Sequence, residues 1–208
     1  MDPFDDPDWL FDVKYDGFRG LCYIEPGRNR LVSRHGNAFD RFDAFADQIA
    51  AALDVHDVIL HGEIIAADET GRPVFIDLLR GTRALAYVAF DLLWLEIDVD
   101  LRQLPLHERR KRLQPIMPAR SSIISEPVSV IGRGCELFEL MCANDLEGVV
   151  AKRLADPYEP RVRWLKIKNP DYTQKEGRGD LFDWSRQPTW RRAVALSAQN
   201  LPSPKGVP

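Results

Sequence analysis

Cysteine is scarce in this sequence, and no two cysteines have the spacing of a metal or redox motif. The three cysteines, Cys22, Cys135 and Cys142, form an odd and widely separated set without a CxxC pair. A structural zinc site or a disulfide framework needs paired cysteines at short, regular intervals. The pattern therefore argues against both, and it is typical of buried thiols in a cytosolic protein.

Long apolar runs are also absent. No segment approaches the roughly 18 consecutive apolar residues that a membrane-spanning helix needs. The first residues, Met1 to Asp6, are acidic and contain no apolar stretch, so we expect neither a secretory signal nor a membrane location. With 45% hydrophobic and 29% charged residues, the composition predicts an ordinary globular protein of the cytoplasm.

An overall excess of positive charge is missing as well, since the formal net charge is −4. Such a balance lacks the global basic character of many nucleic-acid-binding proteins. Basic residues are nevertheless concentrated in two segments, 102–120 and 152–178. The first has six basic residues and one glutamate, and a solvated helix face is its favoured interpretation. The second, with eight basic and four acidic residues, is the better candidate for a cationic binding surface.

Strand patterns outnumber helix patterns, and short turns often join them. Apolar, aromatic and β-branched residues predict strands at 9–14, 18–25, 31–33, 58–66, 86–95, 147–152 and 163–168. A helical period predicts helices at 39–53, 106–113 and 136–144. We therefore expect an α+β fold, with antiparallel sheets flanked by helices. After Lys168 the remaining 40 residues predict at most one helix, at 187–201, and a flexible end.

The segment FDVKYDGFRG, Phe11 to Gly20, holds the strongest candidate for a reactive side chain. Lys14 follows a strand pattern and precedes Asp16 and Gly17, which predicts a strand end with the lysine amine over a cleft. A lysine becomes a nucleophile when neighbouring cations, desolvation or a metal-bound phosphate favour its free amine. The alternative is a polar strand end followed by a turn, and the KxDGxR pattern alone does not decide between them.

Three further motifs place polar or aromatic side chains where a ligand contact is conceivable. Arg34, in SRHGNAF, suits a phosphate or ribose contact, although an ordinary loop is the simpler explanation. Glu63, in the apolar strand LHGE, needs partners, which are either sugar hydroxyls or a salt bridge. Phe90, in VAFDLLWL, is either a core residue or a ligand platform. Its neighbour Asp91 lies in the same apolar run, so an ionised carboxylate there requires a partner such as an arginine.

Two later motifs point to phosphate and metal chemistry. Glu147, in LEGVVAK, precedes a glycine at the mouth of an apolar strand and suits a hard cation such as magnesium, held largely through water. Lys166 and Lys168, in WLKIKNP, point the same way along a strand. Two ammonium groups on one face favour an anion between them, and a nucleotide phosphate is the natural ligand. A solvated edge strand, which lysines also protect, is the alternative.

The order of these motifs resembles that of the covalent nucleotidyltransferase superfamily, which contains DNA ligases, RNA ligases and mRNA capping enzymes. The segments FDVKYDGFRG, EGVVAKR and RWLKIKNPDYTQKEGRGDLF are most similar to bacterial ATP-dependent DNA ligases of the end-joining type and their stand-alone relatives. The resemblance covers about Trp9 to Phe182. It implies a nucleotidyltransferase fold (ATP-grasp-like, of the ligase adenylation type), with a nucleotide cleft between the antiparallel sheets.

In that family the motif lysine attacks the α-phosphate of ATP, AMP passes to the 5′-phosphate of a nick, and the 3′-hydroxyl seals the strand. The resemblance implies that Lys14 is this nucleophile. It implies ribose contacts by Arg19 and Glu63, adenine stacking by Phe90, and phosphate contacts by Arg34, Lys166 and Lys168. Asp12 stands where relatives often carry a glutamate near the adenine amino group, and it is a shorter acid. The implied metal, Mg²⁺ or Mn²⁺, is assigned to Glu147 and Glu63.

The resemblance also implies a nucleotidyltransferase domain over residues 1–182 and a C-terminal tail over 183–208. Most relatives continue into an OB-fold domain that clamps DNA, and its five strands do not fit in the residues after Lys168. We therefore expect either a truncated chain or a minimal enzyme for which a protein partner supplies the clamp. Nicked double-stranded DNA is the implied substrate. The alternatives are an RNA ligase with the same chemistry and an accessory module that binds ATP or a nick without sealing it.

Overall fold

A computed structural model describes residues 1–33, 35–96 and 99–175 of the chain. These residues divide between a compact unit, Met1–Tyr172, and a second unit that begins at Thr173 and contains the short 3-10 helix η3 (Thr173–Lys175). The predicted helix at 187–201, the tail and the domain boundary at 182 lie outside the described residues. The description below concerns the first unit.

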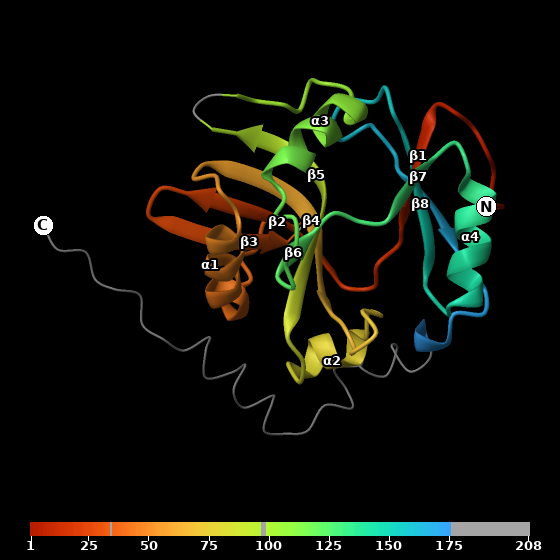
Figure 1. Ribbon diagram of the computed structural model, residues 1–208, viewed down its shortest axis with the longest axis horizontal. Helices are drawn as coiled ribbons and strands as arrows, with labels where there is room; N and C mark the ends of the chain where they lie inside the picture. Colours follow the sequence, from red (N-terminus) through yellow and green to blue (C-terminus); the bar gives the residue numbers. More distant parts are fainter. Residues whose placement is uncertain (34, 97–98, 176–208) are drawn as a thin grey trace, which may run out of the picture. The chain divides into compact units, whose positions relative to one another are not determined.

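Two β-sheets carry the fold (Figure 1). One has the strand order β3-β2-β4-β5-β6, built from β2 (Phe18–Glu25), β3 (Arg28–Ser33), β4 (Val58–Ala66), β5 (Leu85–Leu95) and β6 (Ile124–Ser125). The other has the order β7-β1-β8-β9, built from β1 (Trp9–Val13), β7 (Ser129–Ile131), β8 (Gly148–Arg153) and β9 (Leu165–Lys168). Neighbouring strands are antiparallel, except for the parallel pair β5–β6.

Helices cover each sheet and divide the apolar residues into separate cores. The helices α1 (Asp43–Ala52), α2 (Phe75–Arg80) and α3 (Leu106–Leu113) pack on the five-stranded sheet, together with η1 (Asp40–Phe42) and η2 (Gln114–Ile116). Its core includes Leu60, Ile49 and Leu92. The helix α4 (Gly134–Ala143) lies against β1 and β8 of the four-stranded sheet (Figure 1), where Phe11, Leu137 and Val149 form the second core. None of the described helices is long and apolar enough to span a membrane.

The predicted α+β class, with antiparallel sheets and flanking helices, is confirmed. Each predicted strand and helix within the described residues is present, with ends that shift by a few residues; the pattern at 39–53, for example, divides into η1 and α1. Pattern reasoning missed α2, β6 and β7. These elements have six, two and three residues, which is too short for a period to stand out from the surrounding loops.

A buried ion pair ties α3 to β5, and it confirms that Asp91 needs an arginine. Arg109 Nε lies 2.7 Å from Asp91 Oδ1 and Arg109 Nη2 lies 2.8 Å from Asp91 Oδ2, with both side chains almost fully buried. Arg109 Nη1 also donates to the carbonyls of Leu104 (2.6 Å) and Asp156 (3.1 Å). Because Asp156 follows β8, this one guanidinium connects the five-stranded sheet to a segment of the four-stranded sheet.

Arg110, the next arginine of α3, also turns inward. The prediction that segment 102–120 forms a solvated helix face is therefore wrong for Arg109 and Arg110. Arg110 donates to the carbonyl of Phe90 (3.0 Å) and to Ser129 Oγ (3.2 Å). The following residues, Lys111 and Arg112, are exposed as expected. A run of basic residues shows no period by which the inward positions can be recognised, because all its members are hydrophilic.

Replacing Arg109 by methionine tests how strongly this tie stabilises the fold. The variant leaves the Asp91 carboxylate buried without its cation, so we expect a loss of about 3–5 kcal/mol in the free energy of unfolding. Urea denaturation followed by circular dichroism measures it. The matched control is Arg112→Met on the exposed face of the same helix, which should change stability by less than about 0.5 kcal/mol. Equal stability of the two variants would contradict the proposed importance of the pair.

Candidate active site

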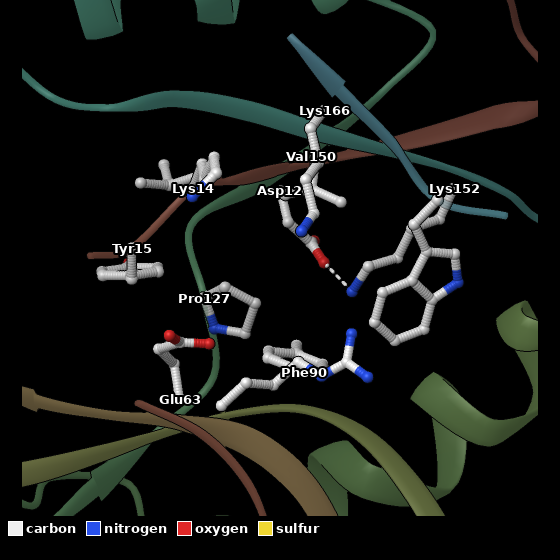
Figure 2. Close-up of a pocket in the computed structure, with 12 residues that line it drawn as sticks. Asp12, Lys14, Tyr15, Glu63, Phe90, Pro127, Val150, Lys152 and Lys166 are labelled. Atoms are coloured by element: carbon white, nitrogen blue, oxygen red, sulfur yellow. Dashed lines mark hydrogen bonds and ion pairs between the residues drawn. The ribbon is translucent and has the colours of Figure 1, made fainter. Parts of the chain in front are cut away.

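A pocket of about 140 Å³ lies between the two sheets, and both contribute to its lining (Figure 2). From the four-stranded side come Asp12, Val13, Lys14, Val150, Lys152, Trp164 and Lys166. From the five-stranded side come Arg19, Glu63 and Phe90, and the loop residues Tyr15 and Pro127 complete the wall. The structure thus brings together six predicted site residues from five different strands or their ends: Asp12, Lys14, Arg19, Glu63, Phe90 and Lys166.

The backbone around Lys14 explains why this lysine reaches the pocket. β1 ends at Val13, and the amide of Lys14 still donates to the carbonyl of Gly148 at 2.9 Å, which fixes its backbone beside β8. The chain then turns at Gly17, where an added Cβ would lie 2.1 Å from the carbonyl oxygen of Ile64. A side chain is therefore excluded at Gly17, and this close approach brings the chain from one sheet to the other.

The Lys14 amine is paired with Glu147, which comes just before β8. The ammonium and the carboxylate are in direct contact, and the two side chains expose only 15% and 11% of their surface. Glu147 is not part of the pocket lining itself, but it reaches the pocket through Lys14. A lysine with an acceptor for its proton this close is suited to give up that proton as it attacks an electrophile.

Cations surround Glu63 in the same space. Arg19 and Glu63 are directly paired across β2 and β4, so both side chains leave the sheet on one face. Arg19 and Lys166 form no hydrogen bond or ion pair with any other residue in the described part of the chain. Burial lowers the pKa of the Lys166 ammonium, and the neighbouring charges of Lys14 and Arg19 lower it further. Lys14, Arg19 and Lys166 thus bring three positive charges together, and the nearby carboxylates do not neutralise all of them. Such an excess of positive charge favours an anionic ligand.

Asp12 has an internal partner that sequence reasoning missed. Its carboxylate is buried, with Oδ2 at 2.5 Å from Lys152 Nζ and Oδ1 at 2.6 Å from Ser129 Oγ. Figure 2 shows Lys152 extended toward Asp12, with the ion pair drawn as a dashed line. Burial lowers the pKa of the Lys152 ammonium, and the contact with Asp12 opposes this effect.

Aromatic rings enclose the Lys152 ammonium, and two of them line the pocket. Lys152 Nζ lies 4.3 Å from the ring centroid of Phe90 and 4.2 Å from that of Trp164. The two rings meet edge to face, with centroids 5.5 Å apart, and His61 packs against both. Burial lowers the pKa of His61 well below its usual value, as do the charges of Arg19 and Lys152, so this imidazole is neutral.

The strand period of two could have identified Lys152. In a strand, residues two apart share a face, so Lys152 projects to the same side as Val150, and both line the pocket. Trp164 carries no such signal, because it precedes β9 and its position depends on the loop between β8 and β9.

Besides Glu147, two predicted residues are not placed in the pocket lining. Lys168 is exposed at the end of β9 and is not among the lining residues. Arg34 lies outside the described residues. Among the residues that the structure describes, no group of three or more His, Cys, Asp or Glu side chains is arranged to hold a metal ion.

A larger cavity of about 520 Å³ adjoins the first pocket and shares Arg19, Trp164 and Lys166 with it. Its other lining residues include His61, Arg102 and Tyr158, whose hydroxyl lies 3.0 Å from His61 Nδ1. Arg19 and Lys166 therefore line two adjoining spaces, of which the second is the larger.

Comparison with solved structures places this architecture among ATP-dependent ligases. A mycobacterial DNA ligase D, described as complexed with ATP and MES, aligns with a TM-score of 0.66 and 30% identity over 79% of this chain and 56% of that one. The ligase domain of Mycobacterium tuberculosis LigD aligns with a TM-score of 0.64 and 29% identity, over the same shares of the two chains. The predicted nucleotidyltransferase fold is thereby confirmed.

Sequence comparison leads to the same group. The chain is 33% identical over 177 residues to the multifunctional non-homologous end joining protein LigD of Pseudomonas aeruginosa, which covers 77% of this chain and 20% of that protein. The first relatives found are all LigD proteins, and the chain spans only about a fifth of their length. Residues 1–168 match the profile of the family described as ATP dependent DNA ligase domain. Since this match covers most of the 208 residues, the chain belongs to the ATP-dependent DNA ligase domain family.

Proposed function

We propose that the chain is the catalytic core of an ATP-dependent DNA ligase that acts in strand-break repair and recombination. The observation that carries the proposal is the position of Lys14, in contact with Glu147 and facing a pocket with Arg19 and Lys166. An amine beside a proton acceptor, in a site that attracts phosphate, suits nucleophilic attack on a phosphorus atom. The mycobacterial DNA ligase D described as complexed with ATP supports ATP as the substrate.

In the first step, the Lys14 amine attacks the α-phosphorus of ATP. A nitrogen–phosphorus bond forms, the bond to the β-phosphate oxygen breaks, and pyrophosphate leaves with its electron pair. Glu147 is in contact with the amine and accepts the proton that Lys14 loses. Arg19 and Lys166 stabilise the negative charge on the phosphates, which is the main contribution a protein makes to such a transfer.

In the later steps, an oxygen of the 5′-phosphate at a nick attacks the same phosphorus and releases Lys14, which regains a proton. The 3′-hydroxyl then attacks the activated 5′-phosphate and displaces AMP, so the strand is sealed. We assign ribose contacts to Arg19 and Glu63, adenine contacts to Asp12 and Phe90, and phosphate contacts to Lys166. Arg34 and Lys168 are proposed as further phosphate contacts from their motif positions alone.

We propose that Glu63 and Glu147 would hold a divalent cation, Mg²⁺ or Mn²⁺. The pKa of the Glu63 carboxyl is raised to about 7, chiefly by burial, and the Glu147 carboxylate raises it further, whereas Lys14 and Arg19 oppose the effect. The two carboxylates thus repel each other when both are ionised. A cation would relieve this, with phosphate oxygens and water as its remaining ligands, and it would neutralise charge on the departing pyrophosphate.

Nicked double-stranded DNA is the proposed acceptor, and a protein partner that holds the DNA is part of the proposal. The wider cavity beside the pocket supports an acceptor that approaches Arg19 and Lys166 from a second side. The proposed domain covers residues 1–182 with a tail over 183–208. The three free thiols support a location in the cytoplasm.

Intact mass spectrometry after incubation with ATP and magnesium tests the first step. We expect the native chain to gain the mass of one AMP, and Lys14→Ala to gain none, because the mutant lacks the nucleophile. Lys111→Ala, which removes an exposed lysine of α3, serves as the matched control and should react like the native chain. No adduct on the native chain, or an equal adduct on Lys14→Ala, would contradict the proposal.

Sealing assays with nicked DNA and nicked RNA duplexes separate the ligase classes. An adduct accompanied by DNA sealing supports the DNA ligase, whereas preferential sealing of RNA supports the alternative. If the chain forms the adduct but seals DNA only after a candidate clamp protein is added, sealing depends on a partner. If pre-adenylated nicked DNA is also left unsealed under every condition, the chain is an accessory module.

The raised pKa of Glu63 predicts a pH-dependent stability in the absence of nucleotide and metal. Because the folded-state pKa of about 7 lies above the ordinary value of 4.5, the native fold holds an extra proton between these limits and loses stability as pH rises through them. Glu63→Gln removes this penalty. Its stability relative to the native chain should therefore rise from about zero at pH 4 by up to about 3 kcal/mol at pH 8.

Urea denaturation across this pH range measures the difference, with the exposed Glu69→Gln as control. We expect the control to follow the native curve at each pH. A constant difference between Glu63→Gln and the native chain from pH 4 to pH 8 would show that folding does not raise the pKa of the Glu63 carboxyl.

A further inference from the structure

The residues that follow β9, 169–172, form hydrogen bonds to the two segments that carry Lys14 and Glu147. None of them lines the pocket or the cavity beside it. The side chains of Asn169 and Tyr172 are nevertheless almost fully buried. Any effect of these two polar side chains on the chemistry therefore passes through the residues that they hold.

Asn169 holds the loop that carries Glu147. Its backbone amide donates to the carbonyl of Glu147 at 3.0 Å, and its Nδ2 donates to the carbonyl of Leu146 at 3.1 Å. The loop has an unusual backbone, because φ is +50° at Asp145 and +129° at Gly148. A backbone of this shape persists where the surrounding structure fixes it. The hydrogen bonds from Asn169 therefore help to determine where the Glu147 carboxylate projects.

Tyr172 holds the turn that follows Lys14. Its hydroxyl donates to Asp16 Oδ2 at 2.9 Å, and both side chains are buried. Burial raises the pKa of the Tyr172 hydroxyl, and the charges of Glu147 and Asp145 raise it further, so the hydroxyl stays protonated and able to donate. Because Asp16 is two residues from Lys14, this bond restricts the path of the chain beside the amine.

The two sets of bonds converge on one contact. Asn169 fixes the side of the carboxylate, Tyr172 fixes the side of the amine, and the Lys14 amide donates to the carbonyl of Gly148 between them. An amine that attacks phosphorus and passes its proton to a neighbour needs both groups at the right distance and angle. Errors of about 1 Å in such a geometry can cost about 100-fold in rate.

We propose that Tyr172 and Asn169 are positioning residues for the transfer of AMP to Lys14. In that step the Lys14 nitrogen bonds to the α-phosphorus, pyrophosphate leaves with its electron pair, and Glu147 takes the proton. The inference rests on the proposed function, because it concerns the rate of this step. Since neither side chain lines the pocket, loss of either should slow the transfer and leave the affinity for nucleotide intact.

Tyr172→Phe removes one hydroxyl and keeps the buried ring. We expect the first-order rate of AMP transfer at saturating ATP to fall about tenfold to 100-fold, because Lys14 is less well placed. Acid quenching followed by intact mass spectrometry measures this rate. The affinity for α,β-methylene-ATP, whose bridging carbon prevents release of pyrophosphate, should stay within about twofold of the native value. Isothermal titration calorimetry measures that affinity.

Tyr87→Phe is the matched control. The Tyr87 hydroxyl is also buried, and it donates to the carbonyls of Gly20 (3.0 Å) and Leu60 (3.2 Å) in the five-stranded sheet. Both variants lose a buried hydrogen bond, so both should lose stability in urea, but only Tyr172→Phe should transfer AMP slowly. A merely structural role of Tyr172 would leave the rates of both variants native, and a general effect of lost stability would slow both equally. Either result would overturn the proposal.

Asn169→Ala removes the bond to the Leu146 carbonyl. We expect transfer to slow about tenfold, again with unchanged affinity for α,β-methylene-ATP. Asn29→Ala, which removes an exposed amide bonded to Asp47 at 2.9 Å, should react at the native rate. Because both positioning residues act on one contact, the double variant with Tyr172→Phe should slow transfer by less than the product of the two single effects.

The outcomes separate this inference from the proposed function. If the native chain forms the adduct and Tyr172→Phe forms it equally fast, the inference is refuted and the proposed function is retained. A native rate in Asn169→Ala, or single effects that multiply in the double variant, would refute the shared role of the two residues. If Asn169→Ala does not fold, Tyr172→Phe and its control still decide the question. A native chain that forms no adduct refutes both proposals.

Discussion

The buried contact between Asp91 and Arg109 is the interaction on which the arrangement of the sheets most depends. Each sheet has its own apolar core, so hydrophobic burial alone does not specify how the two sheets face each other. Arg109 joins β5 to the segment after β8 through the Asp91 carboxylate and the Asp156 carbonyl. A second connection, from Arg72 to Asp145 at 2.6 Å, is partly exposed and therefore contributes much less.

Because polar side chains hold the two sheets together, room for the pocket remains between them. Because a packed core would fill the space between the sheets, a ligand site there requires contacts that hold the sheets together while leaving room between them. Arg109 and Arg110 do so from one helix: the first binds behind β5, and the second donates to the carbonyl of Phe90. The residues that line the pocket are thus supported from outside it, by side chains that no ligand needs to touch.

Charges within the pocket are arranged in two groups with different purposes. At one end, Lys14, Arg19 and Lys166 lie near Glu63 and Glu147, and their mutual effects appear in the altered pKa values of Glu63 and Lys166. At the other end, Asp12 and Lys152 neutralise each other among aromatic rings. The first group suits charge that is gained and lost during phosphoryl-type transfer, whereas the second forms a neutral pair.

Local pattern in the sequence was sufficient for the longer helices and strands, the α+β class, the family motifs and the need of Asp91 for an arginine. Periodicity and the cost of an unpaired buried charge both act over short segments, whereas α2, β6 and β7 were too short to show a period. Tertiary structure alone decided that Arg109 is that partner, that Lys152 pairs with Asp12, and that Trp164 closes the pocket while Lys168 stays outside its lining. These pairings join residues far apart in the chain, and their identity depends on the strand order β7-β1-β8-β9 and on the packing of α3. A linear pattern carries no information on which distant charges the fold brings within a hydrogen bond of one another.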